Sequence, residues 1–343
     1  MAWLRSVLAF PVAAFYASVA AVVGWARRRR RVRSGLPVIS VGNLSVGGSG
    51  KTPVAMHIAQ MLQPHHPCIV LSRGYGRDDG GDEQLVWWSG QLPPPTPERY
   101  GDEPSLIARK LYNGAVGVAN RRATLLPIFA AARPDGVILL DDGFQHQSVA
   151  RDLDLVIVDD ATANAPLPIP AGRLREWPGA LRRADVILAT SHRAATWAKR
   201  HCANTTLLLM MNTRFDGVTR WGDHAQIEAA GSAAILVTGI ANPQRVATMA
   251  TEQGVRIIEW LQFRDHHRYT QDHANQIANL MKQHPTALLL TTEKDAVKLE
   301  QFPELRGQVA VMKISVEIEG EEKLTELIRT IASRRATTPG SFH

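Results

Sequence analysis

The residues best suited to chemistry in this sequence are a lysine and a threonine that end a glycine-rich run, GNLSVGGSGKT at 42–52. In such a loop the backbone N–H groups point at phosphate oxygens, the lysine reaches the β- and γ-phosphates, and the threonine hydroxyl can bind Mg²⁺. The motif G-x-x-x-x-G-K-[ST] is met except at its first glycine, where Ser45 stands. The alternative is a glycine-rich turn without a ligand. We predict that a nucleoside triphosphate is bound by Ser45, Val46, Gly47, Gly48, Ser49, Gly50, Lys51 and Thr52.

A second candidate site is an aspartate pair, Asp141 and Asp142, which follows the apolar run 136–140. A carboxylate at the end of a buried strand holds Mg²⁺, directly or through water, in many phosphate-loop proteins. Together with Thr52, the pair predicts a magnesium site. An ordinary strand-terminal Asp-Asp-Gly turn remains the alternative.

Apolar runs alternate with helix-like segments through the first part of the chain, with strands predicted at 38–41, 68–71, 115–118, 136–140, 155–158 and 186–189. This alternation predicts an α/β fold, a P-loop NTPase-like parallel sheet covered by helices. Ligands bind such sheets at the carboxyl ends of the strands. We therefore expect the phosphate loop and the aspartate pair to share one crevice with Arg73, Asn120 and Arg121.

Three further segments are predicted from local composition. Residues 78–98 are polar and then proline-rich, which favours a surface loop, and 101–111 should be a helix. The strand–helix pattern restarts after about residue 205, with strands at 234–237, 287–291 and 309–311. We predict a core domain over 36–205 and a smaller α/β domain over 206–343 that faces it across a cleft. The last residues, 334–343, should be frayed.

The N-terminal segment, residues 1–35, combines an uncharged run at 7–25 with an arginine cluster. The run is long enough to cross a bilayer, and it could also lie in the interface or act as a secretory signal. Positive charge after the run and a phosphate loop soon after it argue against export. We predict a membrane-associated helix on the cytoplasmic face, lying on the surface rather than spanning it, with the arginines against anionic headgroups.

The net charge and the cysteine positions argue against two kinds of function, nucleic-acid binding and cysteine-based metal binding. The formal net charge is +7, and it is matched by the seven arginines of residues 1–34, so a general nucleic-acid-binding surface is not implied. Cys68 and Cys202 are far apart in the sequence and have no metal-ligand spacing. They are typical of thiols in a reducing compartment.

With these motifs in order, the chain resembles the tetraacyldisaccharide 4′-kinases, the lipid A kinases of Gram-negative bacteria. The resemblance covers nearly the whole chain and rests on VGNLSVGGSGKTP at 41–53, SRGYG at 72–76, GDEP at 101–104, DDGFQH at 141–146, RD-x-D-x-VIVD at 151–159, PAG-x-LRE at 170–176, DH at 265–266 and TEKDAVK at 292–298. It implies ATP-dependent phosphorylation of the 4′-hydroxyl of a tetraacylated glucosamine disaccharide 1-phosphate, giving lipid IVA at the inner membrane.

The resemblance also implies roles for single residues. Asp102 matches the base that accepts the proton of the sugar hydroxyl, and His266 its partner from the second domain. Without the resemblance, a helix N-cap and a solvated loop histidine are the simpler interpretations. Glu176 joins the aspartates as a Mg²⁺ candidate. Four residues are candidates to bind the phosphate and sugar of the lipid, although solvated surface positions are equally compatible with their types: Arg73, Arg77, Asn120 and Arg121.

Two other classes of function stay open. A membrane-tethered P-loop ATPase switch would act on a partner protein, but its dimerising branch usually carries a second lysine where this chain has Val46. A P-loop phosphotransferase with a soluble substrate would not need the apolar and basic N-terminal segment. ATP turnover that requires a lipid acceptor would separate the three classes.

Overall fold

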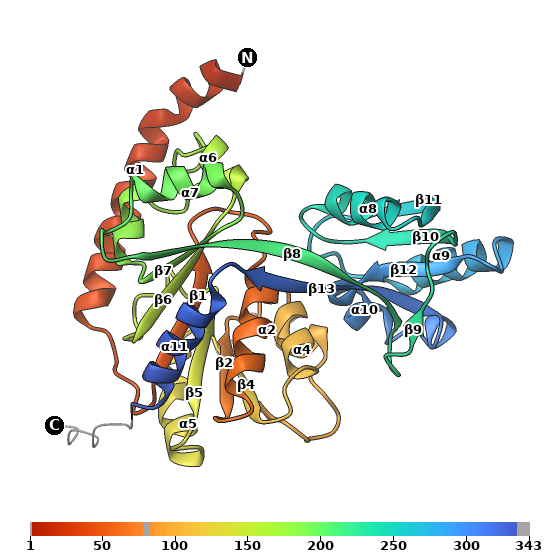
Figure 1. Ribbon diagram of the computed structural model, residues 1–343, viewed down its shortest axis with the longest axis horizontal. Helices are drawn as coiled ribbons and strands as arrows, with labels where there is room; N and C mark the ends of the chain where they lie inside the picture. Colours follow the sequence, from red (N-terminus) through yellow and green to blue (C-terminus); the bar gives the residue numbers. More distant parts are fainter. Residues whose placement is uncertain (1, 78–82, 335–343) are drawn as a thin grey trace.

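The computed structural model describes residues 2–77 and 83–334. Two lobes share a 13-stranded sheet, with strand order β11-β10-β12-β13-β8-β7-β6-β1-β5-β2-β4-β3 and β9 paired to β8 (Figure 1). The first lobe holds β1 (Val38–Asn43), β2 (Cys68–Ser72), β3 (Leu85–Trp88), β4 (Gly114–Val118), β5 (Val137–Asp141), β6 (Leu153–Val158) and β7 (Val186–Ala189). All of these strands run parallel except β3, which is antiparallel to β4.

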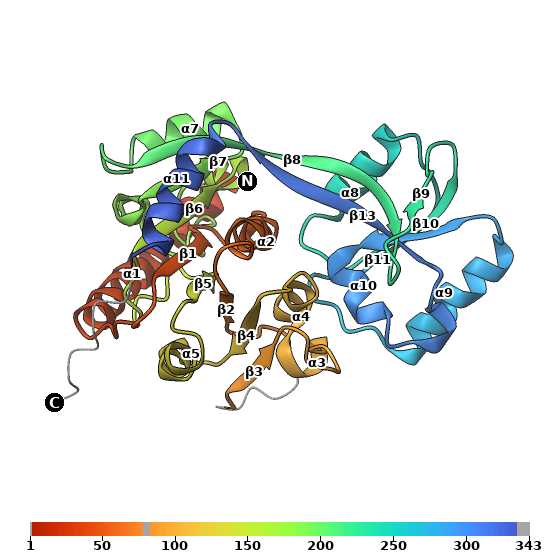
Figure 2. The same ribbon diagram turned by 60° about the horizontal axis from the view of Figure 1, so that its bottom comes forward.

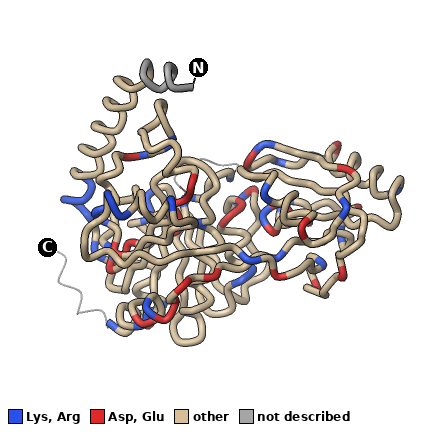
Figure 3. The backbone as a smooth tube through the Cα atoms, turned by 45° about the horizontal axis from the view of Figure 1, so that its top comes forward, with Lys and Arg blue, Asp and Glu red and all other residues tan. Residues whose placement is uncertain are grey.

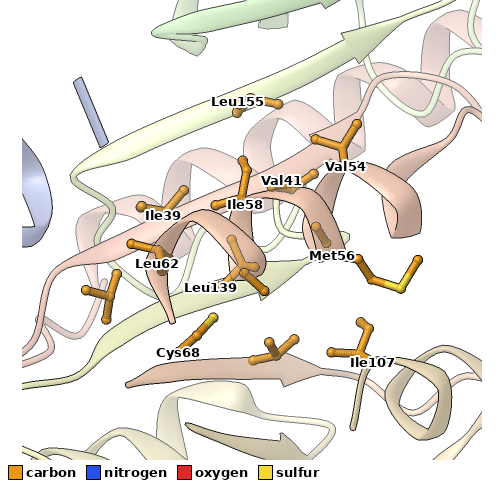
Figure 4. Packing of buried hydrophobic residues seen from close by; sticks show 14 of the residues in the cluster. Ile39, Val41, Val54, Met56, Ile58, Leu62, Cys68, Ile107, Leu139 and Leu155 are labelled. Atoms are coloured by element: carbon orange, nitrogen blue, oxygen red, sulfur yellow. The ribbon is translucent and has the colours of Figure 1, made fainter. Parts of the chain in front are cut away.

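Helices cover both faces of the first-lobe sheet, which explains why its central strands are apolar along their whole length. Every residue of β1, β5 and β6 is buried. On one face, α2 (Lys51–Leu62) packs Val54, Ile58 and Leu62 against the sheet (Figure 4). The same lobe also contains α3 (Pro97–Tyr100), α4 (Asp102–Ala108), α5 (Leu126–Ala132), α6 (Asp160–Asn164) and α7 (His192–Lys199).

The second lobe is a smaller α/β unit. Its parallel strands are β10 (Ala233–Thr238), β11 (Arg256–Gln262) and β12 (Leu288–Thr292), with β13 (Val309–Ile318) beside β12 and the short β9 (Gln226–Ile227) paired to β8. Its helices are α8 (Pro243–Glu252), α9 (Gln271–Gln283) and α10 (Glu293–Leu299). The three strands predicted for this half are present, but the last runs to Ile318 and is much longer than the predicted 309–311.

Two long strands connect the lobes. β8 (Leu207–Arg220) begins in the first lobe beside β7 and continues antiparallel to β13 into the second lobe. β13 then returns the chain to the first lobe, where α11 (Glu321–Ala332) packs against the face covered by α2 (Figures 1 and 2). A hydrogen bond between the side chains of His57 of α2 and Glu321 adds to this packing. The division therefore differs from the predicted range 206–343, because the chain after β13 belongs to the core of the first lobe.

A second difference concerns residues 78–98. The predicted surface loop contains β3, whose Leu85 and Trp87 are buried, and α3 begins just before its end. Residues 78–82 lie outside the described residues, as do 335–343 of the segment predicted to fray. The alternation of buried and partly exposed residues in Leu85–Trp88 is the period of a strand with one face on the core.

The N-terminal helix α1 (Ala2–Arg29) lies along the first lobe and projects beyond it (Figure 1). Ala13 and Ala17 are buried, and Arg28 Nε donates to Gln147 Oε1 at 2.9 Å. The opposite side is apolar and exposed; Phe15 is 73% exposed and Val22 65%. Lysine and arginine gather where the helix meets the body (Figure 3). By length and composition, the span Ala9–Arg29 is the candidate membrane-crossing helix among the described residues.

Candidate active site

A cavity of about 900 Å³ lies between the two lobes and is bounded on one side by α1. From the first lobe it is lined by the phosphate loop, Arg73 and the aspartate pair, and from the second lobe by Asn242, Asp265, His266 and Lys294. The α1 residues on its wall are Tyr16, Val19, Ala20, Val23, Gly24 and Arg27. The lobes are close together at this point, since a Cβ added to Gly48 would lie 3.1 Å from Ala241 Cβ.

The phosphate loop joins β1 to α2 with positive φ at Gly47 and Gly50, so the turn depends on glycine there. Gly50 caps α2 without a side-chain hydrogen bond to the first turn of the helix. The amides at this helix start therefore face the cavity with the positive end of the helix dipole behind them, which favours a phosphate. Lys51 Nζ lies 3.3 Å from Asn43 Oδ1 and 3.7 Å from Asp142 Oδ1.

The predicted ATP-binding residues divide into two groups. Val46 through Thr52 line the cavity, whereas Ser45 is buried and is absent from the described cavity wall. The Ser45 hydroxyl accepts a hydrogen bond from Thr162 Oγ1 at 2.9 Å. At this position, where the general motif has glycine, the hydroxyl ties the loop to α6.

The aspartate pair lies at the carboxyl end of β5, beside the phosphate loop. Ser72 Oγ donates to Asp141 Oδ2 at 3.3 Å, while Asp141 Oδ1 is buried without a hydrogen-bond partner. Burial, Glu103 and Asp142 raise the pKa of Asp141 to about 7. Because a bound cation would relieve both the desolvation and the repulsion, this donor set fits Mg²⁺.

Asp142 has a different environment from its neighbour. Burial alone would raise its pKa, but Lys51 and Arg175 outweigh burial and hold the pKa below the usual value. Arg175 Nη1 donates to both carboxylate oxygens, at 3.0 and 2.8 Å. The backbone of Asp142 has a φ of 46°, an uncommon conformation for a residue other than glycine. Asp142 is therefore an ionised carboxylate between two cations at the cavity wall.

Glu176, the third predicted Mg²⁺ candidate, lines the same cavity but is paired with a cation. Arg183 Nη2 donates to its Oε1 at 2.9 Å. Within the described ranges, no group of three or more His, Cys, Asp or Glu side chains is arranged to hold a metal ion. Phosphate-loop proteins supply only one or two protein ligands and leave the rest to the nucleotide and water, so Thr52 and Asp141 remain a sufficient pair.

Asp102 and His266, predicted as partners from the two domains, lie within hydrogen-bond distance, with Nδ1 of His266 3.2 Å from Asp102 Oδ2. Burial favours a raised pKa for Asp102, but the hydrogen bond from His266 and the charges of Lys298 and Lys294 hold it below the usual value. His266 lines the cavity, and its φ of 56° is left-handed. The ring meets that of Tyr75 edge-on at 4.8 Å.

Of the four predicted lipid-binding residues, the structure brings one to the cavity. Arg73 lines it, whereas Arg77, Asn120 and Arg121 are absent from its described wall. Arg77 is largely buried and donates to the carbonyl of Glu83 at 3.3 Å. Asn120 and Arg121 are exposed at the end of β4. Strand order explains this, because β4 lies two strands from β5 with β2 between them.

Sequence reasoning missed several charged residues of the cavity, of which Arg175, Glu103 and Lys294 are the clearest. Each belongs to a segment that was noted, namely 170–176, 101–104 and 292–298. The missing signal was spatial. Arg175 pairs with Asp142 from 33 positions along the chain, and Lys294 approaches His266 from 28.

Three features define the class of P-loop phosphotransferases. A phosphate loop follows the central strand of a parallel sheet, acidic residues stand at the end of the neighbouring strand, and a carboxylate–histidine pair lies across a cleft. Residues 5–333 match the family model described as tetraacyldisaccharide-1-P 4′-kinase. This chain belongs to that family.

Curated relatives and a solved structure agree with this membership. The tetraacyldisaccharide 4′-kinase of Actinobacillus succinogenes is 34% identical over 84% of this chain and 82% of its own. The same-named protein of Desulfotalea psychrophila is 33% identical over 86% of this chain and 88% of its own. The crystal structure of LpxK from Aquifex aeolicus in complex with ATP has a TM-score of 0.78 and 26% identity, and the match covers 95% of this chain and 99% of that one. The α/β fold and the N-terminal apolar helix are thereby confirmed.

Proposed function

We propose that this protein transfers the γ-phosphoryl group of ATP to the 4′-hydroxyl of a tetraacylated glucosamine disaccharide 1-phosphate, giving lipid IVA. One observation carries the proposal. The phosphate loop, the aspartate pair, the Asp102–His266 pair and an apolar wall from α1 all line or adjoin the same cavity. Transfer to a soluble acceptor would need the phosphate loop, the aspartate pair and the Asp102–His266 pair. Only a lipid acceptor explains the apolar wall from α1.

ATP binds with its phosphates in the loop from Val46 to Thr52 in this scheme. The amides at the start of α2 hold the phosphate oxygens, and Lys51 follows the γ-phosphoryl group as its charge is redistributed. Lys51 now lies close to Asn43 and Asp142, so it is already directed at this end of the sheet. Thr52 and Asp141 are the proposed residues for Mg²⁺, with Asp142 and Glu176 further from that role because Arg175 and Arg183 pair with them. When bound, Mg²⁺ supplies positive charge that neutralises the phosphates.

The sugar hydroxyl is a weak nucleophile, and the Asp102–His266 pair accepts its proton in this proposal. Asp102 stays ionised at neutral pH because its pKa is lowered. An ionised Asp102 accepts the Nδ1 hydrogen of His266, which lines the cavity with its Nε2 3.2 Å from Lys294 Nζ. His266 therefore orients Asp102 and shares the proton with it. The two residues act as one proton-accepting unit.

The lipid would enter from the membrane along α1. The helix presents apolar residues to solvent on one side and Tyr16, Val19, Ala20 and Val23 to the cavity on another. We propose that the exposed side lies in the cytoplasmic leaflet of the inner membrane, with the arginines at 27–33 against the headgroups. Arg73 and Arg27, both on the cavity wall, are placed to meet an anionic sugar phosphate.

The direct test is to incubate the protein with ATP, Mg²⁺ and tetraacyldisaccharide 1-phosphate and to look by mass spectrometry for a lipid that carries one more phosphoryl group. Lys51→Met provides the matched inactive control. ATP hydrolysis that is indifferent to the lipid would favour the switch instead, and equal phosphorylation of a deacylated sugar would favour a soluble substrate.

The membrane proposal has its own test. Deletion of residues 2–33 should release the protein from membrane fractions and lower its activity on lipid in vesicles. The double variant Phe15→Ser/Val22→Ser should weaken vesicle binding with the fold intact, because both side chains are exposed. Leu92→Ser is the matched control, since Leu92 is 89% exposed but far from α1 in the sequence. Retention of the deleted protein on membranes would assign the anchor to another surface.

A further inference from the structure

Helix α10 of the second lobe lies beside α4 of the first lobe (Figure 2). Ion pairs join α10 and the residue after it to the segment 102–110. Lys294 Nζ lies 3.6 Å from Glu103 Oε1, and Lys110 Nζ lies 2.7 Å from Glu293 Oε1. Glu300, just after α10, pairs with Arg109. In the middle of this row stands Lys298, and its partner in the first lobe is Asp102.

Lys298 is the most buried member of this row, with only 3% of its surface exposed. Its ammonium lies 2.9 Å from Asp295 Oδ1 and 3.6 Å from Asp102 Oδ2, and it donates to the carbonyl of His267 at 3.1 Å. The ring of Tyr269 lies 5.2 Å from the same nitrogen. These contacts fix the position of the cation from the second-lobe side.

The position of Lys298 differs from that of Lys294, one helical turn away. Lys294 lines the cavity and lies 3.2 Å from His266 Nε2, so it can touch a substrate. Lys298 is absent from the described cavity wall and lies behind the Asp102–His266 pair. Within the Asp102–His266 pair, the charge of Lys298 therefore acts directly on Asp102.

A carboxylate as buried as Asp102, which is 5% exposed, is costly to keep ionised without nearby positive charge. The hydrogen bond from His266 and the charge of Lys298 both favour the ionised form. The charged and titratable side chains that face Asp102 are Lys298 and Lys294 from α10, His266 and Tyr269 from the preceding loop, and Glu103 from its own helix. Of the two lysines, Lys294 is shared with Glu103 and Asp265.

We propose that Lys298 is a positioning residue for phosphoryl transfer: it arrives with the second lobe, holds Asp102 as an ionised carboxylate and orients its Oδ2 toward His266. The proposal rests on the kinase function above. The segment 266–298 supplies both the histidine of the pair and the buried cation behind the aspartate. Closure of the lobes therefore brings both groups to Asp102 together.

The test is the pH dependence of kcat for lipid phosphorylation, measured on the full chain in vesicles at saturating ATP. Lys298→Met removes the charge at similar length. The pKa of Asp102 then rises, and the acidic limb of the kcat profile moves toward neutral pH by about one unit or more. The loss of kcat is thus about tenfold larger at the acidic end than at pH 8.5, while KM for ATP changes little. Lys298→Arg keeps the charge and should keep the limb near its original position.

Lys298→Met also leaves Asp295, which is fully buried, without its cation, and this can unfold the protein. The double variant Lys298→Met/Asp295→Asn removes both charges and keeps the volume, so it tests the proposal on a folded protein. Asp295→Asn alone retains the cation beside Asp102 and should not shift the acidic limb of the kcat profile to higher pH. Lys110→Met, which breaks another contact of the same row, should affect closure without moving the limb.

The outcomes separate cleanly. An upward shift in the double variant that is absent from Asp295→Asn and Lys110→Met supports the positioning role. A loss of kcat that is uniform with pH and follows the loss in thermal stability overturns it and leaves Lys298 with a structural role only. Absence of lipid phosphorylation in the unaltered protein would count against the proposed function instead.

Discussion

Two strand–helix units of this protein, one in each lobe, show how a single supersecondary structure can serve opposite electrostatic purposes. In the first lobe, β1 is separated from α2 by the loop 44–50, and the helix begins without a side-chain cap. In the second lobe, α10 follows β12 directly, and Thr292 caps it by accepting a hydrogen bond from the N–H of Asp295. The first helix leaves its N-terminal amides free to bind an anion, whereas the second helix satisfies an N-terminal amide with the Thr292 side chain.

The difference extends to the side chains. After β1 the loop 44–50 has three glycines and no charged side chain, so the backbone and Lys51 do the binding. After β12 the helix carries charges on a face that meets the other lobe, and they pair with Asp102, Glu103, Arg109 and Lys110. An open helix start suits a ligand that comes and goes, whereas a capped helix with paired charges suits a contact made within the protein.

Breaking the first unit should have the largest effect. Lys51→Ala removes the charge that follows the γ-phosphoryl group, and we expect phosphoryl transfer to fall about a thousandfold or more. Arg173→Ala is the control, because Arg173 is also a cation at the loop, donating to the carbonyl of Val46 at 2.9 Å, but is exposed. Lipid phosphorylation is the measurement. Near-normal turnover in folded Lys51→Ala would refute the phosphate-loop assignment.

The second-largest effect is expected at the Asp102–His266 pair, which lies against the second unit. Asp102→Ala should lower kcat at least about a hundredfold, the usual scale for a lost proton acceptor, with ATP affinity little changed. His266→Ala should be milder if His266 only orients Asp102. The double variant should lose much less than the sum of the two single losses in activation free energy, because the residues act together.

Additive losses in that double-mutant cycle would separate Asp102 and His266 into independent roles. Unaltered kcat with lowered stability in Asp102→Ala would leave Asp102, which does not cap its helix, with a structural role only.

A pH effect should sharpen the contrast between the arginine-rich first lobe and the paired charges of the second. Burial and the charges of Arg122, Arg73 and Arg151 lower the pKa of His146 to about 3. In the unfolded chain the histidine takes up its proton near pH 6.5, so the stability of the fold is complete above that value and is lost as pH falls toward 3. At pH 5 this loss is about 2 kcal/mol.

His146→Gln should therefore make the melting temperature less sensitive to pH between 6.5 and 4. Calorimetry against pH measures this, with His65→Gln as a control at an exposed histidine. An unchanged pH slope in His146→Gln would mean that the arginines do not act on this position.

The smallest expected effect is at the edge of the contact between the lobes. Glu300→Gln breaks the pair with Arg109 while the acceptor for Trp221 Nε1 is retained. Because Glu300 is about a third exposed, we expect less than about 1 kcal/mol, seen as a rise in KM below about fivefold. The difference from the unaltered protein should shrink at high salt. A loss as large as that of Asp102→Ala would make this pair essential for closure.

The sequence by itself determined the features that reside in contiguous residues. The apolar strands 38–41, 136–140 and 155–158, the loop before Lys51 and the aspartates after β5 were all predicted correctly as local elements. Their signals are a run of β-branched residues, glycine where φ is positive and charge where a strand ends, and each is complete within about a dozen residues. The resemblance to a kinase family, which the comparisons confirm, rests on the same short motifs.

Only the tertiary structure decided which of these residues meet. Asp102 and His266 are 164 positions apart, and nothing in either neighbourhood specifies the contact. It depends on the register of β8 against β13, which sets where the second lobe lies, and on α10, which brings Lys298 behind Asp102. The same register returns α11 to the first lobe. Pairing between distant strands is a collective result of packing the whole chain, so a local pattern can predict a strand but not its neighbour.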